Sequence, residues 1–270
     1  MEHDVRGVVR RNLSGVAGDL VEPLGRGLDN TAYLVDGAWV VRFPGDPEAL
    51  DVEREARLLR EIAGVLDGIV AVPEPAFVAD GAMGYALLPG VPLMLLQPPD
   101  LTAIADTLAS VLTALHAQSP ARFAGLVSED ADPPSTWLDE LRGMTVDLPE
   151  AVAFLEAAPP APATTLVFSH NDLGAEHVLV DPETWRVTGI IDWSDAALCD
   201  PAYDYGLLLR DLGPQAPAPP PPLRERALFY ARAGLIEDLA YGEDPANPDP
   251  HRSTYVRKSR DRAKTLFHAD

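Results

Sequence analysis

The sequence predicts an α+β chain of two lobes. Residues 1–89 should form an antiparallel sheet with one helix, and residues 90–270 should be mainly helical. Two observations support this. Short apolar runs, separated by glycine, proline and an Asp-Gly pair, dominate the first part and are typical of hairpins. Longer amphipathic runs replace them after Pro89, so we expect the lobe boundary near residues 88–93.

Composition limits the kind of protein. The chain has 270 residues, 47% of them hydrophobic, and this suits a folded core. Its apolar runs are far shorter than the ~20 residues that a membrane helix needs, and its first residues do not resemble a signal peptide. The single cysteine, Cys199, excludes an internal disulfide framework and a cysteine zinc site. We therefore expect a cytoplasmic monomer without a membrane partner.

The formal net charge of −21 narrows the expected partners. Such a chain repels nucleic acid phosphates and anionic membranes, whereas it attracts a cationic substrate. We expect no nucleic-acid partner. An adaptation to solubility would explain the same charge, so both interpretations stay open.

Strand and turn signals alternate near the start of the chain. We expect a helix within residues 1–20, and a strand, a glycine turn and a second strand over residues 24–35. Gly25 and Gly27 would let backbone amides approach a phosphate group. Asn30 stands where a longer nucleotide-binding motif has its third glycine, so an ordinary hairpin is the alternative.

An inward-facing carboxylate is predicted on a helix over residues 46–66, with Asp46 as its cap and Pro47 in its first turn. Glu55 shares its face with the apolar residues of this helix, whereas Glu53 should face solvent. A buried carboxylate needs a partner, and Arg42, in the strand expected over residues 39–44, is the available cation. Protein kinases hold nucleotide phosphates with such a pair. A glutamate at the helix edge is the alternative.

A second hairpin is expected over residues 77–80 and 85–88. Ala86 to Leu88 would then form a hinge that receives a purine base through backbone hydrogen bonds. We interpret His116 as a structural histidine. Further helices are expected over residues 101–117, 137–144, 149–158, 223–241 and 252–264.

The stretch from Phe168 to Trp193 carries the candidate chemistry. Apolar runs over residues 165–168, 178–180 and 187–191 predict three short strands. His170 and Asp172 then open a polar loop, His177 closes it, and Asp192 ends the last strand. We expect these side chains to meet at one end of a small sheet. Phosphoryl transfer needs such an arrangement, with one carboxylate to orient a hydroxyl and ligands for Mg²⁺.

More carboxylates follow this stretch. Asp200-Pro201 is typical of a helix start, with Asp204 in the first turns, and we give both acids a structural role. Asp195 has no such role and could bind a hydroxyl or an ammonium group at the mouth of the site. We interpret the acids between residues 237 and 244 as a solvated face.

These residues resemble the aminoglycoside phosphotransferase family, which comprises antibiotic kinases with a protein-kinase-like fold. The resemblance covers nearly the whole chain. Its motifs, in order, are Gly25-Arg26-Gly27-Leu28-Asp29, Val41-Arg42-Phe43-Pro44, Glu55, Leu88-Pro89-Gly90-Val91-Pro92-Leu93, Leu115-His116, His170-Asn171-Asp172, Ile191-Asp192-Trp193 and Asp200-Pro201.

The resemblance implies a role for each candidate residue. Asp172 would be the catalytic base, and His170 would support the conformation of its loop. Asp192 would bind metal, and His177 stands where the broader fold has an asparagine as second metal ligand. Mg²⁺ is the implied cofactor, and ATP or GTP the implied co-substrate. The implied nucleotide-binding residues are Gly25, Gly27, Asp29, Asn30, Arg42, Glu55, Ala86 and Leu88.

Two branches of the family are similar to this chain. Histidine at position 177 is similar to both the 2″-aminoglycoside and the macrolide phosphotransferases. The stretch from Asp195 to Ala197 is similar to the first branch, where the equivalent of Asp195 binds the drug. Arg42, in place of the usual lysine, is similar to the second. Asp211 is the single acid where the first branch has an acidic cluster, and it is the other candidate substrate residue.

We therefore expect transfer of the γ-phosphate of ATP or GTP to a hydroxyl of a cationic aminoglycoside. A macrolide kinase with the same chemistry is the first alternative. A metabolic small-molecule kinase of the same fold is the second, and a nucleotide-binding module without catalysis is the third.

Overall fold

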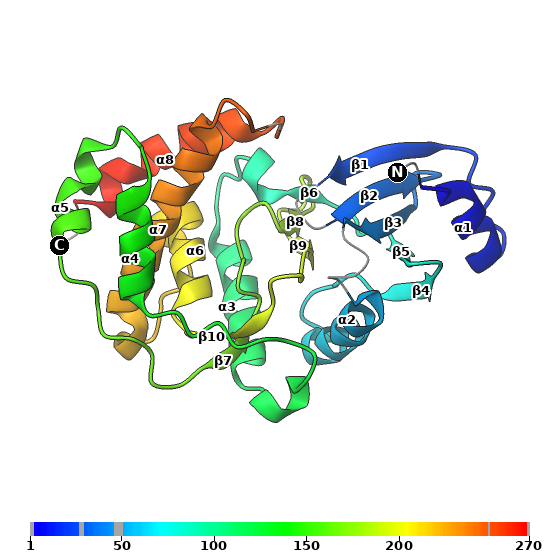
Figure 1. Ribbon diagram of the computed structural model, residues 1–270, viewed down its shortest axis with the longest axis horizontal. Helices are drawn as coiled ribbons and strands as arrows, with labels where there is room; N and C mark the ends of the chain where they lie inside the picture. The colour runs from blue at the N-terminus through cyan, green and yellow to red at the C-terminus, as the bar shows by residue number, and fades with distance from the viewer. Residues whose placement is uncertain (1–2, 27–29, 46–50, 248, 269–270) are drawn as a thin grey trace.

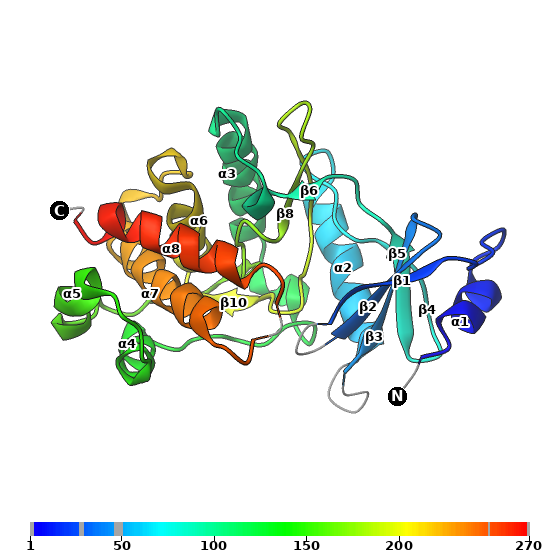
Figure 2. The same cartoon turned by 90° about the horizontal axis from the view of Figure 1, so that it is seen from above.

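The computed structural model describes residues 3–26, 30–45, 51–247 and 249–268. Figures 1 and 2 show a strand-rich part beside a mainly helical part, which confirms the predicted fold class. The division into residues 1–89 and 90–270 stays a prediction. Within the described ranges, no helix is both long and apolar enough to span a membrane.

The N-terminal part is built on a five-stranded antiparallel sheet with the order β1-β2-β3-β5-β4. A short helix, α1 (Val5–Asn12), precedes it, and α2 (Val52–Leu66) joins β3 to β4. The strands are β1 (Val21–Arg26), β2 (Asn30–Val35), β3 (Trp39–Pro44), β4 (Pro75–Ala79) and β5 (Ala82–Ala86).

Strand β3 is buried on both faces, and this determines where Arg42 points. Val41 and Phe43 pack with α1 in one apolar cluster, whereas Val40 packs with α2 in the other. Side chains alternate along a strand, so Arg42 shares the face of Val40 and extends toward α2. The sheet thus places a cation next to the helix that carries Glu55.

Helix α2 begins where a cap allows it. Asp51 accepts a hydrogen bond from the Arg54 amide at 3.0 Å, and the helix then runs from Val52. The predicted start at Asp46 and Pro47 lies outside the described residues. Glu53 is exposed and Glu55 is largely buried, as the apolar periodicity predicts.

The C-terminal part packs its helices around one large apolar cluster. Helices α6 and α8 both pack on the long helix α7 (Figure 2). Its helices are α3 (Thr102–His116), α4 (Pro134–Gly143), α5 (Val152–Glu156), α6 (Tyr203–Leu212), α7 (Arg224–Glu243) and α8 (Arg252–Leu266). Each confirms a predicted helix, with two exceptions. In α5 only residues 152–156 of the expected 149–158 are α-helical, and α6 begins at Tyr203 without a cap from Asp200, which was expected to start it.

Two small sheets carry the central stretch, where one was expected. Strands β8 (Val178–Val180) and β9 (Val187–Ile190) pair with β6 (Val91–Pro92) in the order β6-β8-β9. Strand β7 (Val167–Ser169) pairs instead with β10 (Ala197–Cys199). The expectation of a single sheet was wrong, because a three-residue strand carries too little pattern to identify its partner.

Candidate active site

The polar loop between β7 and β8 is held in a compact turn. The Gly174 amide donates to the Asp172 carbonyl at 2.9 Å, and the His177 amide donates to the Gly174 carbonyl at 3.1 Å. Asn171 and Asp192 adopt positive φ angles of 63° and 61°, an uncommon conformation for residues other than glycine. Polar residues held in this conformation are typical of a functional site.

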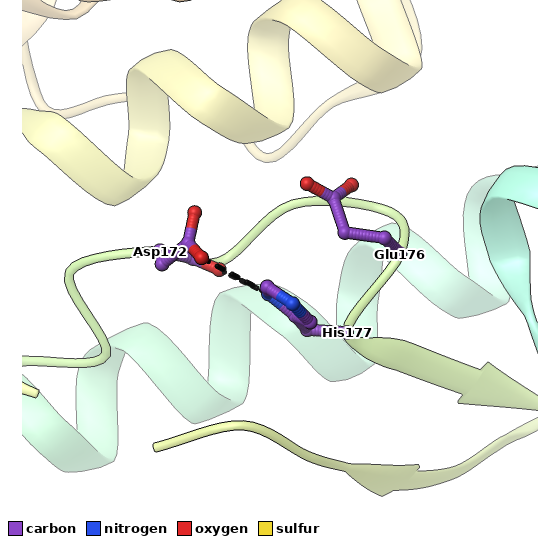
Figure 3. A group of neighbouring side chains, drawn as sticks. All are labelled: Asp172, Glu176 and His177. Carbon is purple, nitrogen blue, oxygen red and sulfur yellow. Dashed lines mark hydrogen bonds and ion pairs between the residues drawn. The ribbon is translucent and has the colours of Figure 1, made fainter. Parts of the chain in front are cut away.

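Asp172, His177 and Asp192 are brought together as predicted. His177 Nδ1 lies 2.8 Å from the Asp172 carbonyl oxygen and 3.4 Å from its carboxylate (Figure 3). A carbonyl can only accept, so Nδ1 carries the proton of this bond, and in the neutral ring the lone pair of Nε2 is left for another partner. Nε2 lies 3.8 Å from Asp192 Oδ2. His177 and Asp192 can therefore offer one nitrogen and one oxygen ligand to the same cation.

Asp192 is poised as an anion. Burial would raise the pKa of its carboxyl group, but Arg42 and His177 outweigh burial and hold that pKa below its usual range. Its Oδ1 accepts a hydrogen bond from Ser194 Oγ at 2.8 Å and lies 3.8 Å from Arg42 Nη2. A carboxylate of this kind is suited to hold a hard divalent cation.

Asp172 behaves differently. Burial raises the pKa of its carboxyl group, His177 opposes the shift, and Glu176 adds to it. A carboxylate with a raised pKa is a better proton acceptor near neutral pH. The environment thus separates two nearby aspartates into a proton acceptor and a permanent anion.

Glu176 was not predicted as a site residue. One ligand atom from each of Asp172, Glu176 and His177 lies within 4.8 Å of the others. Figure 3 shows both carboxylates extending to the same side of the loop. Arg210 Nη2 on α6 lies 3.7 Å from the Glu176 carboxylate. Because Glu176 adjoins His177 within an apolar stretch, only its tertiary neighbours reveal it.

The predicted ion pair between Arg42 and Glu55 is confirmed, with Nη1 and Oε1 2.9 Å apart and side chains only 10% and 13% exposed. Attraction between the two charges alone would lower the pKa of Glu55 and raise that of Arg42, but both pKa values are raised. Burial raises the pKa of Glu55 despite Arg42. Burial alone would lower the pKa of Arg42, but Glu55, Tyr85 and Asp192 together outweigh it and raise that pKa. Desolvation is the largest single effect on this pair, and a buried ion pair commonly gains little net free energy over an apolar one. The contact with Asp192 makes Arg42 the link between sheet and loop.

The other candidate nucleotide residues are described only in part. Gly27 and Asp29 lie outside the described residues. Gly25 lies in β1 next to a shift in strand register, and Asn30 begins β2 opposite Pro44. Ala86 ends β5 and Leu88 follows it, with the intervening Leu87 amide bonded to the Ala38 carbonyl at 2.8 Å.

The two candidate substrate residues lie in different surroundings. Asp195 lines a cavity of about 420 Å³ together with Asn171, Ser194 and residues 128–132. Asp211 has a side chain only 8% exposed and forms a bidentate bond with Arg210, at 2.9 and 3.1 Å. Asp211 was expected to bind substrate, but its carboxylate is buried and its charge is compensated by Arg210.

His170 and Asp204 are buried supports of the loop. His170 Nε2 lies 3.0 Å from the Ile191 carbonyl oxygen, and its ring packs on Trp193. Asp204 accepts hydrogen bonds from the amides of His170, Asn171 and Leu173 at 3.0, 3.4 and 3.4 Å. Burial raises the pKa of Asp204 to about 6, although these donors oppose the shift. The sequence predicted a structural role for Asp204 near a helix start, but it did not predict the bonds of Asp204 to the loop.

The protein has two lobes, and Arg42 on a strand of the first lobe contacts Asp192, which lies beside Asp172 and His177 in the second. This arrangement is typical of a phosphotransferase. The chain matches the phosphotransferase enzyme family over residues 20–241 and belongs to it. It is similar to the viomycin phosphotransferase of Streptomyces vinaceus, with 29% identity over 175 residues, 57% of this chain and 60% of that protein.

Two solved structures share the fold. The GDP and kanamycin complex of APH(2″)-IIIa has a TM-score of 0.71 and 23% identity, with 96% of this chain and 97% of that chain covered. Macrolide 2′-phosphotransferase type I has a TM-score of 0.65 and 24% identity, with 96% and 95% covered. At these identities, the two structures support the fold and leave the acceptor open.

Proposed function

We propose that this protein transfers the γ-phosphate of ATP or GTP to a hydroxyl group of an antibiotic, with Mg²⁺ as cofactor. The observation that carries the proposal is the meeting of Asp172, His177 and Asp192 at the end of the loop, with Arg42 reaching Asp192 from the sheet. The names of the relatives support an antibiotic acceptor, and the GDP in one related structure supports a nucleotide co-substrate.

Each residue has a defined part in this chemistry. Asp172 orients the acceptor hydroxyl and takes up its proton. Asp192 and His177 Nε2 would hold the cation. The carboxylate oxygen is the ligand type that Mg²⁺ prefers, and the imidazole nitrogen is a softer one. When bound, Mg²⁺ would neutralise charge on the β- and γ-phosphate oxygens. His170 maintains the loop through its bond to Ile191.

The sheet holds the nucleotide in this proposal. Arg42, oriented by Glu55, contacts the phosphates, and its planar fork can bond two oxygens at once. The backbone near Gly25 and Asn30 covers the phosphates, and the hinge between Ala86 and Leu88 receives the base. Most of the rate enhancement then comes from positioning and charge stabilisation.

The acceptor we favour is a cationic aminoglycoside. The cavity at Asp195 supports it, because Glu129, Asp130 and Asp132 also line that cavity and could pair with substrate ammonium groups. A second candidate is a macrolide. The buried pair of Asp211 with Arg210 favours a macrolide. Asp211 is the single acid among residues 209–213, and because it is bonded to Arg210 this segment offers no carboxylate to a polycationic drug.

A drug panel separates the candidates. Purified protein with MgATP or MgGTP is mixed with gentamicin-like, erythromycin-like and viomycin-like drugs, and recovered drug is analysed for one added phosphoryl group. We expect product from at least one class in the wild type and none in Asp172→Asn. Nucleotide binding without product from any drug would refute the antibiotic acceptor. A sugar or amino-alcohol acceptor, tested in parallel, would then identify a metabolic kinase.

A further inference from the structure

Helix α6 carries two carboxylates that both reach the polar loop. Asp204 and Asp211 are seven residues apart, close to two turns, so they lie on the same face of the helix. Asp204 accepts the amides at the start of the loop, as described above. Asp211 Oδ2 accepts the Ala175 amide, near the end of the loop, at 2.7 Å. The helix therefore holds the loop at two points.

The second point is firmly fixed. Asp211 is bonded to both arms of the Arg210 guanidinium, whose Nη1 also donates to Asp238 on α7 at 3.2 Å. Arg262 on α8 donates to the Asp211 backbone carbonyl at 2.8 Å. Burial would raise the pKa of Asp211, but Arg210 holds it below its usual range, so Asp211 remains an anion. Arg210 thus holds the carboxylate of Asp211, and Arg262 holds the backbone that carries it.

Ala175 is the residue through which Asp211 acts. Its carbonyl oxygen accepts the Met94 amide at 3.0 Å, so both sides of the residue are hydrogen-bonded. Ala175 lies inside the turn in which His177 bonds the Asp172 carbonyl at 2.8 Å. A displacement of Ala175 therefore changes the separation of Asp172 and His177, the proposed base and metal ligand.

We propose that Asp211 is a positioning residue for phosphoryl transfer. It fixes the end of the catalytic loop through the Ala175 amide and contacts neither nucleotide nor acceptor. This inference rests on the proposed function and replaces the expectation that Asp211 binds substrate. Removal of the anchor should misplace the reacting groups, and a displacement of about 1 Å can lower a rate by about 10²-fold.

Two substitutions at this position and one control test the inference. Asp211→Ala removes the acceptor of the Ala175 amide, whereas Asp211→Asn keeps one oxygen able to accept it. Asp238→Asn is the matched control, because it alters another carboxylate hydrogen-bonded to Arg210 but leaves the loop contact intact. Urea unfolding first establishes that each variant is folded under the assay conditions.

The decisive readouts are acceptor phosphorylation and nucleotide hydrolysis with water as acceptor. We expect Asp211→Ala to lower kcat for both reactions by the same factor, with acceptor KM and nucleotide affinity close to wild type. Asp211→Asn should restore most of the loss, and Asp238→Asn should retain most of the activity. A raised acceptor KM with unchanged kcat and hydrolysis would mean that Asp211 binds the acceptor directly. If Asp238→Asn lowered kcat as much as Asp211→Ala does, the loss of activity would reflect a general loss of stability. Either result overturns the proposal.

Failure of the proposed function is distinguishable from failure of this inference. If the wild type phosphorylates no acceptor, hydrogen exchange decides the inference instead. Asp211→Ala should then exchange the amides of residues 170–177 faster than Asp238→Asn does. Equal exchange in the two variants would overturn the positioning role.

Discussion

Breaking the ion pair between Arg42 and Glu55 should destabilise the protein strongly. The pair is 2.9 Å long and nearly buried, so Glu55→Gln leaves a guanidinium in the interior, whose remaining partners include Tyr85 and, at 3.8 Å, Asp192. Removal of one partner of a buried pair typically costs 3–5 kcal/mol, and the remaining contact with the half-exposed Asp192 places the expected loss near about 3 kcal/mol. Arg42→Met should cost less, since burial already raises the pKa of Glu55 and eases its protonation.

The double variant isolates the interaction. In Arg42→Met with Glu55→Gln no charge of the pair remains buried, so its loss should fall below the sum of the single losses by about 2 kcal/mol. Urea unfolding at neutral pH measures all four proteins. Glu53→Gln on the exposed face of α2 is the control and should stay within about 0.5 kcal/mol of the wild type. Losses that add to within about 0.5 kcal/mol would refute the reasoning.

Three further predictions test other parts of the molecule. Burial lowers the pKa of His116 from 6.5 to about 4, so between pH 7.5 and 5 the unfolded chain takes up a proton at this residue and the native chain does not; the contribution of His116 to stability should fall by about 2 kcal/mol over this range. In urea titrations His116→Gln should shift the change in stability between these pH values by that amount relative to the wild type, and an identical change in the two proteins would contradict the assignment. Gly206→Ala should cost about 1–3 kcal/mol, because the new Cβ would lie 2.6 Å from Tyr230 Cβ, whereas Gly64→Ala, an interior position of α2 with space, should gain about 0.5–1 kcal/mol. Similar effects of the two alanines would sink this argument. His177→Asn should lower the rate with Mn²⁺ more than the rate with Mg²⁺, since imidazole is the softer ligand, and an equal loss with both metals would argue against metal ligation by His177.

The local periodicity of apolar residues was sufficient to predict the main helices and the buried ion pair between Arg42 and Glu55. The apolar face of α3 recurs every three or four residues, and the helix covers residues 102–116 where 101–117 was expected. The same periodicity turned Glu55 inward, and a buried carboxylate requires a cation, so its bond to Arg42 followed from the sequence.

The partners of the other acids did not follow, because they lie far away along the chain. Asp204 bonds to His170, Asp211 to Ala175 and Asp238 to Arg210. These partners are separated along the chain by 34, 36 and 28 positions. Their neighbours in sequence are compatible with both exposed and buried positions. The acids between residues 237 and 244 were interpreted as a solvated face, yet Asp238 has a side chain only 18% exposed and is bonded to Arg210.

Short strands and the acidic cavity show the same limitation. Strand β10 has three residues and no pattern that distinguishes it from a loop. Its pairing with β7, and the bond of the Leu198 amide to the Ser128 carbonyl at 2.9 Å, bring residues 128–132 beside Asp195. The sequence predicted Asp195 as a candidate substrate residue, but not the acids among residues 128–132 that the fold places beside it.

The central claim is that Asp172 directs the γ-phosphate to a hydroxyl group of the acceptor. Phosphorus-31 NMR of a single reaction with MgATP or MgGTP and the drug tests it most directly. We predict that the γ-phosphate signal is replaced by that of a phosphate monoester in the wild type and persists in Asp172→Asn, while the variant still binds nucleotide. Conversion to inorganic phosphate alone in the wild type, or monoester formation at a near-wild-type rate in Asp172→Asn, would contradict the account.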